Sequence, residues 1–142
     1  MSNLKKFALQ AISILHLRDG NDNLMYADGP DGRPDKSRPM RARLLGPGTK
    51  QYAQARTEQS NRNMDRIKKK GKTDQTAEDS IKETALFLAR CTDGLENIEV
   101  GELEGKDLYV AVYSDLELCF IPTQIDRYIG ETANFTGASP TN

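Results

Sequence analysis

The side chains that most often carry out catalytic or metal chemistry are few in this chain of 142 residues, and their spacing matches no familiar site. The sequence contains one histidine, His16, and two cysteines, Cys91 and Cys119. A structural zinc site takes four ligands, usually in closely spaced pairs, and a nucleophilic cysteine needs an activating neighbour. We therefore interpret both cysteines as free thiols and expect no metal site, no cofactor site and no catalytic residue.

Two other segments contain residue types that are used in ligand binding. Gly46-Pro47-Gly48, followed by Lys50, lacks the Gly-x-x-x-x-Gly-Lys-Ser/Thr spacing of a phosphate loop and is interpreted as a strand-to-helix turn. An acidic run lacks the residue order of a calcium-binding loop and is interpreted as a solvated loop. Its members are Glu96, Glu99, Glu102, Glu104 and Asp107. We therefore expect a protein that binds another chain, and not an enzyme.

Charge is arranged in two opposite blocks, although the net charge is only −1. Residues 50–72 hold eight basic and two acidic residues, and residues 74–107 hold ten acidic and three basic residues. Neighbouring blocks of this kind predict two helices that attract each other. A nucleic-acid surface on the basic block is less favoured, because only Tyr52 is available there for stacking and the pI is about 5.9.

No apolar stretch approaches the roughly 20 residues that span a bilayer, so no membrane partner is expected. We expect a soluble protein of a reducing cytoplasm. The length suits one domain, predicted over residues 1–135, and residues 136–142 predict a flexible tail. The fold class is predicted as α+β, with a small N-terminal antiparallel sheet or hairpin followed by three or four α-helices.

The β-rich region is predicted over residues 4–45. Strand patterns occur at 12–17, 24–26 and 40–45. Residues 28–35 are rich in Gly, Pro and Asp, which predicts a protruding loop between strands.

A helical region is predicted over residues 49–134. Thr49 is the expected N-cap of its first helix, which ends at Gly71. Thr76 begins the second helix, whose glycine stop is expected at Gly94. A thin apolar stripe is expected to turn the first helix toward the rest of the protein. Its members are Ala53, Thr57, Ser60, Met64 and Ile67.

Two apolar helix segments are the candidate partner-binding surfaces. The end of the second helix is apolar on nearly every side, and the last helix, which Pro122 opens after a capping box at 114–117, has a clean apolar stripe. Client helices dock on anchors at such spacings, but stripes of this kind also form protein cores, and both uses remain open. The six candidate residues are Leu86, Phe87, Leu88, Ile125, Tyr128 and Ile129.

Six motifs follow one another along about residues 10–135. They are Arg43-Leu-Leu-Gly-Pro-Gly-Thr-Lys-Gln-Tyr52, Thr76-Ala-Glu-Asp-Ser80, Leu86-Phe-Leu-Ala89, Thr92-Asp-Gly-Leu95, Gln124-Ile-Asp-Arg-Tyr-Ile129 and Ala133-Asn-Phe135. In this order they resemble the tail assembly chaperones of long-tailed bacteriophages. Many members of that family carry Trp after the turn glycine, where this chain has Leu95, so no aromatic contact is carried over to that position.

The resemblance implies a protein of the host cytoplasm that is absent from the mature virion. Such a protein binds and solubilises the tape measure protein, helps to recruit tail tube subunits and is expected to self-associate along its long client. In such systems a longer, frameshifted product often carries an extra C-terminal module. Two alternatives remain open: a structural virion protein of the tail or head-tail junction and, less favoured, a nucleic-acid-binding accessory protein.

Overall fold

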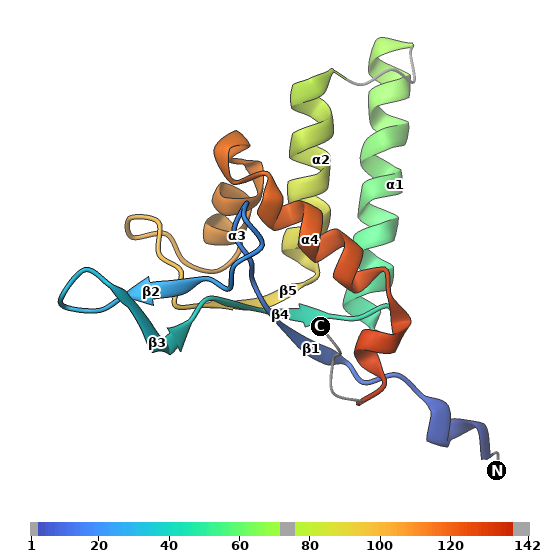
Figure 1. Cartoon of the computed structure of the whole chain (residues 1–142). Coiled ribbons are helices and arrows are strands. Elements are labelled where there is room, and N and C mark those ends of the chain that lie inside the picture. The colour runs from blue at the N-terminus through green and yellow to red at the C-terminus, as the bar shows by residue number, and fades with distance from the viewer. Residues whose placement is uncertain (1–2, 72–75, 138–142) are drawn as a thin grey trace.

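A three-stranded antiparallel sheet lies at the base of the molecule (Figure 1). The computed structural model describes residues 3–71 and 76–137, so most of the predicted tail lies outside the described residues. The sheet has the order β1-β4-β5, and a separate hairpin pairs β2 with β3. The strands are β1 (Ile12–His16), β2 (Tyr26–Asp28), β3 (Pro34–Pro39), β4 (Arg41–Leu45) and β5 (Thr92–Glu96).

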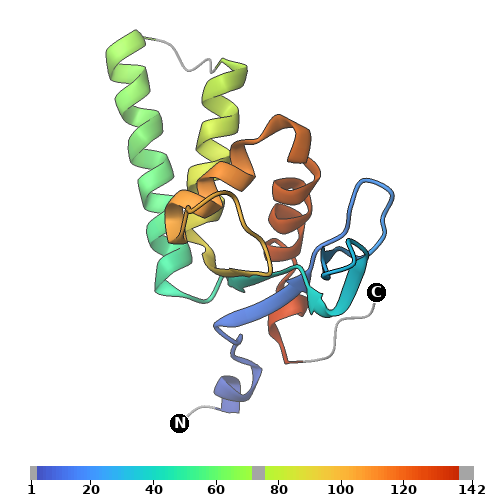
Figure 2. The ribbon, with the colours of Figure 1, turned by 90° about the vertical axis from the view of Figure 1, so that its left-hand side faces the viewer.

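The described residues also contain four α-helices and three short 3-10 turns, which confirms the α+β class. The helices are α1 (Lys50–Lys70), α2 (Ala77–Arg90), α3 (Gly105–Ser114) and α4 (Phe120–Ile129). The turns are η1 (Asn3–Phe7), η2 (Leu116–Leu118) and η3 (Thr132–Phe135). Figures 1 and 2 show α1 and α2 as a long antiparallel pair that stands away from the sheet, with α3 and α4 beside α2.

Strand β4 is the centre of the sheet and shows the expected alternation. Ala42 and Leu44 are fully buried in the core, whereas Arg41 and Arg43 lie on the opposite face of the strand. On that face Arg41 pairs with Glu96 of β5, at 2.6 Å between Nη2 and Oε1. The helices therefore cover one side of the sheet, and ion pairs occupy part of the other.

The glycine stop expected after α2 is wrong. Cys91 caps α2, and the next residue already begins β5, which pairs antiparallel with β4 and places Gly94 opposite Arg43. The register shifts between Arg43 and Leu44, and such a bulge accommodates irregular residues at a sheet edge. The predicted helical region 49–134 is therefore interrupted by the third strand of the sheet.

The loop expected over residues 28–35 is only partly correct. The turn itself is short: Gly29 donates its N–H to the carbonyl of Arg33 at 2.8 Å. Strand β3 then begins at Pro34 and ends at Pro39, positions at which a strand of a two-stranded ribbon tolerates proline. The strand pattern at 24–26 lies two residues early, because β2 covers Tyr26–Asp28.

Both expected ends of α1 and the expected start of α2 are confirmed. Thr49 Oγ1 accepts the N–H of Tyr52 at 3.1 Å, and Gly71 ends α1 in the left-handed conformation with φ 64°. Thr76 and Asp79 form a reciprocal capping box, with the Asp79 N–H at 3.0 Å from Thr76 Oγ1.

The capping box expected at 114–117 is wrong. Ser114 is the last residue of α3, and its hydroxyl donates to the carbonyl of Val110 at 2.6 Å. Asp115 instead caps the short turn η2 by accepting the N–H of Glu117 at 2.9 Å. Helix α4 then begins at Phe120, so Pro122 lies within its first turn, where no intrahelical N–H bond is lost.

The apolar stripe expected on α1 is also wrong. Four of its five members, Ala53, Thr57, Ser60 and Met64, are exposed, and the fifth, Ile67, is partly buried. The face turned toward the body contains Ala55, which is buried, and two arginines that meet Glu83 of α2. Arg62 Nε lies 2.9 Å and Arg66 Nη2 lies 3.2 Å from its carboxylate. Opposite charges therefore join the two helices, as the sequence indicates, and they do so through a largely polar interface.

We predict that Glu83→Ala lowers the free energy of unfolding by about 1–3 kcal/mol, because it leaves two partly buried guanidinium groups without their carboxylate. The Glu83 side chain is only 12% exposed. Urea unfolding followed by circular dichroism measures the change. Asp93→Ala is the control, because the Arg43–Asp93 pair is well exposed and is worth about 0.5 kcal/mol or less. Equal losses in the two variants would contradict the prediction.

The turn between β4 and α1 is packed against the ring of Phe135, which is fully buried. A Cβ on Gly46 would lie 2.4 Å from Cδ1 of that ring, closer than side-chain atoms can approach. A Cβ on Gly48 would meet only the side chain of Leu9, at 3.4 Å. The first glycine of the Gly-Pro-Gly turn is therefore required by packing.

We predict that Gly46→Ala destabilises the protein by about 1–3 kcal/mol through overpacking against Phe135. Thermal and urea denaturation measure the loss. Gly48→Ala, which makes ordinary van der Waals contacts, is the matched control and is expected to change stability by less than about 1 kcal/mol. A Gly46→Ala variant as stable as the native chain would show that the ring moves aside without cost.

Candidate protein-binding groove

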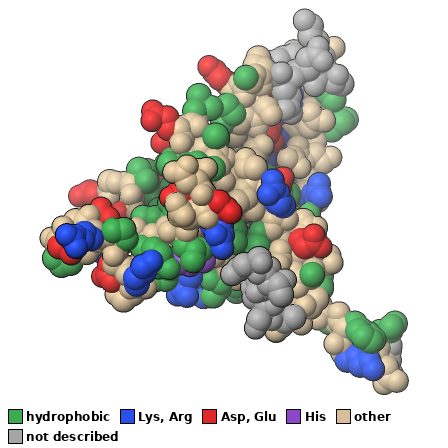
Figure 3. Space-filling view, viewed as in Figure 1, with side chains coloured by type: hydrophobic (Ala, Val, Ile, Leu, Met, Phe, Trp, Pro, Cys, Tyr) green, Lys and Arg blue, Asp and Glu red, His purple; other side chains and the backbone are tan. Residues whose placement is uncertain are grey.

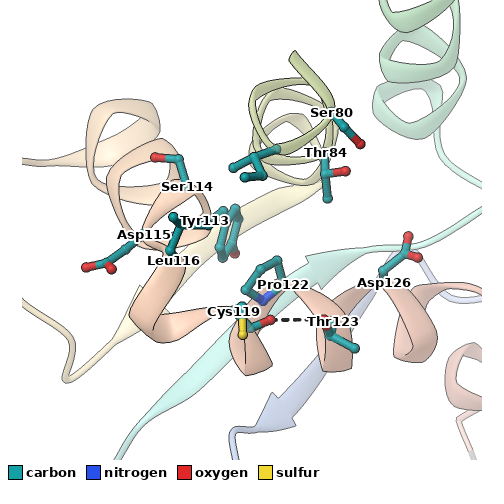
Figure 4. A pocket seen from close by; sticks show the side chains of 11 residues that line it. Ser80, Thr84, Tyr113, Ser114, Asp115, Leu116, Cys119, Pro122, Thr123 and Asp126 are labelled. Carbon is teal, nitrogen blue, oxygen red and sulfur yellow. Dashed lines mark hydrogen bonds between the residues drawn. The ribbon is translucent and has the colours of Figure 1, made fainter. Parts of the chain in front are cut away.

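A groove of about 280 Å³ lies between α2, the α3–α4 connection and α4 (Figure 4). We call it the groove below. Its lining has an apolar part and a polar part. The apolar side chains are Ile81, Tyr113, Leu116 and Pro122. The polar ones are Ser80, Thr84, Ser114, Asp115, Cys119, Thr123 and Asp126.

Tyr113 gives the groove a fixed wall between α3 and α2. Its hydroxyl lies 2.7 Å from Thr92 Oγ1, which in turn donates its proton to the carbonyl of Leu88 at 2.7 Å. Because the Thr92 proton is already used, the Tyr113 hydroxyl is the donor to Thr92. Burial raises the pKa of Tyr113 well above its ordinary value, so the phenol remains neutral and keeps this bond.

Leu116 is the most exposed apolar side chain of the groove, at 68%. It lies in η2, where Asp115 caps the turn and separates α3 from α4. An apolar side chain held on a capped turn at the edge of a groove adds contact area for a partner without closing the groove.

The charged groups of the groove are all of one sign. Its eleven lining residues include two carboxylates, Asp115 and Asp126, and no Lys, Arg or His. In Figure 4 these two side chains lie on opposite sides of the apolar part. A low-dielectric surface edged by carboxylates attracts cationic side chains. The groove is therefore suited to apolar anchors that are accompanied by Lys or Arg.

Polar recesses adjoin the groove where α2 faces α1. Thr84 lines the groove and also a recess of about 410 Å³ that Arg56, Phe87 and Ile129 help to line. The Arg56 guanidinium carbon lies 5.5 Å from the centre of the Phe87 ring, a cation–π distance. The recess shares Asp126 with the groove and adds the cation Arg56, so its lining holds charges of both signs whereas the lining of the groove holds only carboxylates.

The six residues predicted to bind a partner lie close to the groove but do not line it. Phe87, Leu88, Ile125 and Ile129 are buried in the core. Tyr128 packs against the same core and is partly buried, and Leu86 is partly buried outside that cluster. Their contact with a partner stays a prediction, and in this fold four of the six side chains are covered by the chain itself.

Sequence reasoning identified two of the helices that wall the groove but not the faces that they present to it. Ile81 and Thr84 of α2 line the groove, whereas Leu88 of the same helix is buried. Leu116 was placed on one face with Cys119 and Phe120 but was not among the six candidate residues, because that short stripe was assigned to no partner-binding surface. The available signal was a leucine between two acidic residues at a helix break.

The other residues with possible chemistry are separate from one another. His16 Nε2 donates to the carbonyl of Met25 at 2.8 Å, and its ring packs edge-on against Tyr26 with centroids 4.9 Å apart. Cys91 is buried and Cys119 is exposed, and both are free thiols. Over residues 3–71 and 76–137, no three His, Cys, Asp or Glu side chains gather into a possible metal site.

Comparison of the chain with protein-family models, with curated proteins and with solved structures gave no match in any of the three searches. Within the described part of the chain, no helix is both long enough and apolar enough to cross a membrane.

We predict that thiol reagents distinguish the two cysteines. Burial raises the pKa of Cys91 to about 12, so at pH 8 it has almost no thiolate, whereas Cys119 is exposed at the groove. Titration with a chromogenic disulfide at pH 8 is expected to count one thiol in the folded protein and two in urea. Cys119→Ser is the control and is expected to abolish the fast reaction. Two rapidly reacting thiols in the folded native chain would contradict this assignment.

Proposed function

We propose that this chain is a tail assembly chaperone of a long-tailed bacteriophage, which binds and solubilises the tape measure protein and helps to recruit tail tube subunits. The proposal takes the resemblance of the six motifs as its starting point. The observation that supports it most is the groove, with its apolar lining, its exposed Leu116 and its two carboxylates. Such a surface binds another chain without any bond being made or broken.

A client helix is the occupant that this groove favours. Apolar anchors three or four residues apart reach one face of a groove of this kind. Covering an exposed leucine such as Leu116 contributes about 1.5–3 kcal/mol, which is weak for a single site. A long helical client offers the same pattern many times and so binds many copies of the chaperone. The number of contacts then compensates for the weak binding at each one.

Three of the six motifs, at 76–80, 86–89 and 124–129, lie in the two helices α2 and α4 that flank the groove. The motif at 76–80 caps α2, and the motif at 124–129 forms the C-terminal part of α4 from Gln124 to its last residue. The motif at 133–135 ends in Phe135, which packs against the strand-to-helix turn at Gly46. These placements support a common purpose for the motifs, which is to hold α2 and α4 at a fixed separation.

The two alternative functions, nucleic-acid binding and a structural role in the virion, predict different observations. A nucleic-acid surface would use the basic face of α1, but Arg62 and Arg66 are bound to Glu83. A structural protein of the tail or head-tail junction would be found in purified particles. A chaperone of the host cytoplasm would be absent from them, and mass spectrometry of purified virions separates these two cases.

We predict that co-expression with the tape measure protein raises the soluble fraction of that protein, and that Leu116→Asp abolishes the rise. The substitution places a carboxylate in the apolar part of the groove, where a client side chain would cover it. The soluble and pelleted fractions are compared on gels.

Met64→Asp is the matched control, because Met64 is an exposed apolar residue of α1 outside the groove, and this variant is expected to act as the native chain does. If the tape measure protein is equally insoluble with and without the native chain, the proposed function is wrong. If Leu116→Asp remains fully active, the groove is not the client site.

A further inference from the structure

The N-terminal turn η1, residues 3–7, extends from the body as an arm (Figure 1). Phe7 is 71% exposed and Leu4 is 74% exposed, with Lys5 and Lys6 between them. Lys6 Nζ lies 5.1 Å from the centre of the Phe7 ring. In Figure 3 the projecting end at the lower right shows hydrophobic and basic side chains together. The arm therefore presents apolar anchors accompanied by cations.

The arm and the groove have complementary surfaces. The arm contains two apolar side chains, two lysines and no acidic residue. The groove contains an apolar lining, two carboxylates and no basic residue. Surfaces with this charge relation attract each other, and the match also fixes orientation.

The arm is directed away from the groove of its own chain. The Gln10 N–H donates to the carbonyl of Phe135 at 2.7 Å, so the arm leaves the body next to η3, beyond the C-terminal end of α4. The groove lies along the first two turns of α4, between Cys119 and Asp126. Figures 1 and 2 both show η1 pointing away from the helices.

We propose that the arm of one copy of this protein docks in the groove of a second copy, with Phe7 against the apolar lining and Lys5 and Lys6 near Asp115 and Asp126. Each copy has one arm and one groove, so the contact joins different surfaces of the two partners. Such heterologous contacts produce a closed ring when the rotation from each copy to the next returns to the first copy, and an open chain of copies when it does not.

This inference builds on the proposed function, because the arm offers the groove the same chemistry that the client helix would offer. In the absence of client the arms cover the grooves of neighbouring copies. When client is present it competes with the arms for the same lining. Self-association without client is therefore the property to measure.

Cysteine cross-linking in the full chain tests the arrangement. One variant, Asn3→Cys with Cys119→Ser, has its reactive thiol on the arm, and the native chain has its accessible thiol, Cys119, in the groove. After mixing and mild oxidation without client, we expect a disulfide-linked dimer that contains one chain of each kind. Chains with tags of different mass identify it on a non-reducing gel.

A control variant, Gln51→Cys with Cys119→Ser, places the thiol at an exposed position of α1 and is expected to give at least tenfold less dimer. No excess of dimer over this control would overturn the proposal. The single variant Asn3→Cys, which keeps Cys119, tests the other arrangement. If it forms an intramolecular disulfide and no dimer, the arm occupies the groove of its own chain and the proposal is also wrong.

Oligomer mass in solution gives an independent measurement. Phe7→Asp is expected to raise the dissociation constant at least tenfold, and Phe7→Leu, which keeps an apolar anchor, is expected to change it little. Added salt is expected to weaken association, because it screens the lysines from the carboxylates. An unchanged mass in Phe7→Asp would overturn the proposal.

These experiments contain no tape measure protein, so they separate the two hypotheses. Cross-linked dimers together with an insoluble client would refute the chaperone function alone. A soluble client without cross-linked dimers would refute the arm contact alone.

Discussion

The contact between the Phe135 ring and the backbone at Gly46 holds together parts of the chain that are far apart in sequence. The ring is fully buried, and the carbonyl of the same residue accepts the N–H of Gln10. The Gly46 N–H in turn donates to the carbonyl of Ala11. The start of β1, the end of β4 and the turn after α4 therefore meet at one place. With its C-terminal end held there, α4 is positioned to form one side of the groove.

Both ends of α1 and the start of α2 were predictable from the sequence because the interactions that determine them are local. Thr49 and Gly71 bond to groups within four residues of themselves, and the capping box joins Thr76 to Asp79, three positions further on. Strand β5 was not predictable in this way. Its residues Thr-Asp-Gly-Leu-Glu are typical of a turn, and they adopt a strand because β4, some 50 residues earlier, offers an unpaired edge.

The candidate site was harder to predict, because it depends on the side of each helix that remains uncovered. Apolar spacing located α2 and α4 but gave the same signal for Leu88, which is fully buried, as for Ile81, which lines the groove. Which of the two is covered depends on the separation of α2, α3 and α4. The exposed position of Leu116 depends on the turn that Asp115 caps between two helices, and helical periodicity does not predict that turn.

The polar interface between α1 and α2 affects how the protein responds to warming. When Arg62 and Arg66 separate from Glu83, little apolar surface becomes wet, so the heat-capacity change of that opening is small. Hydration of the released ions also becomes less favourable as temperature rises. The ion-paired contact between the two helices is therefore expected to vary less steeply with temperature than the packing of the apolar core beneath them.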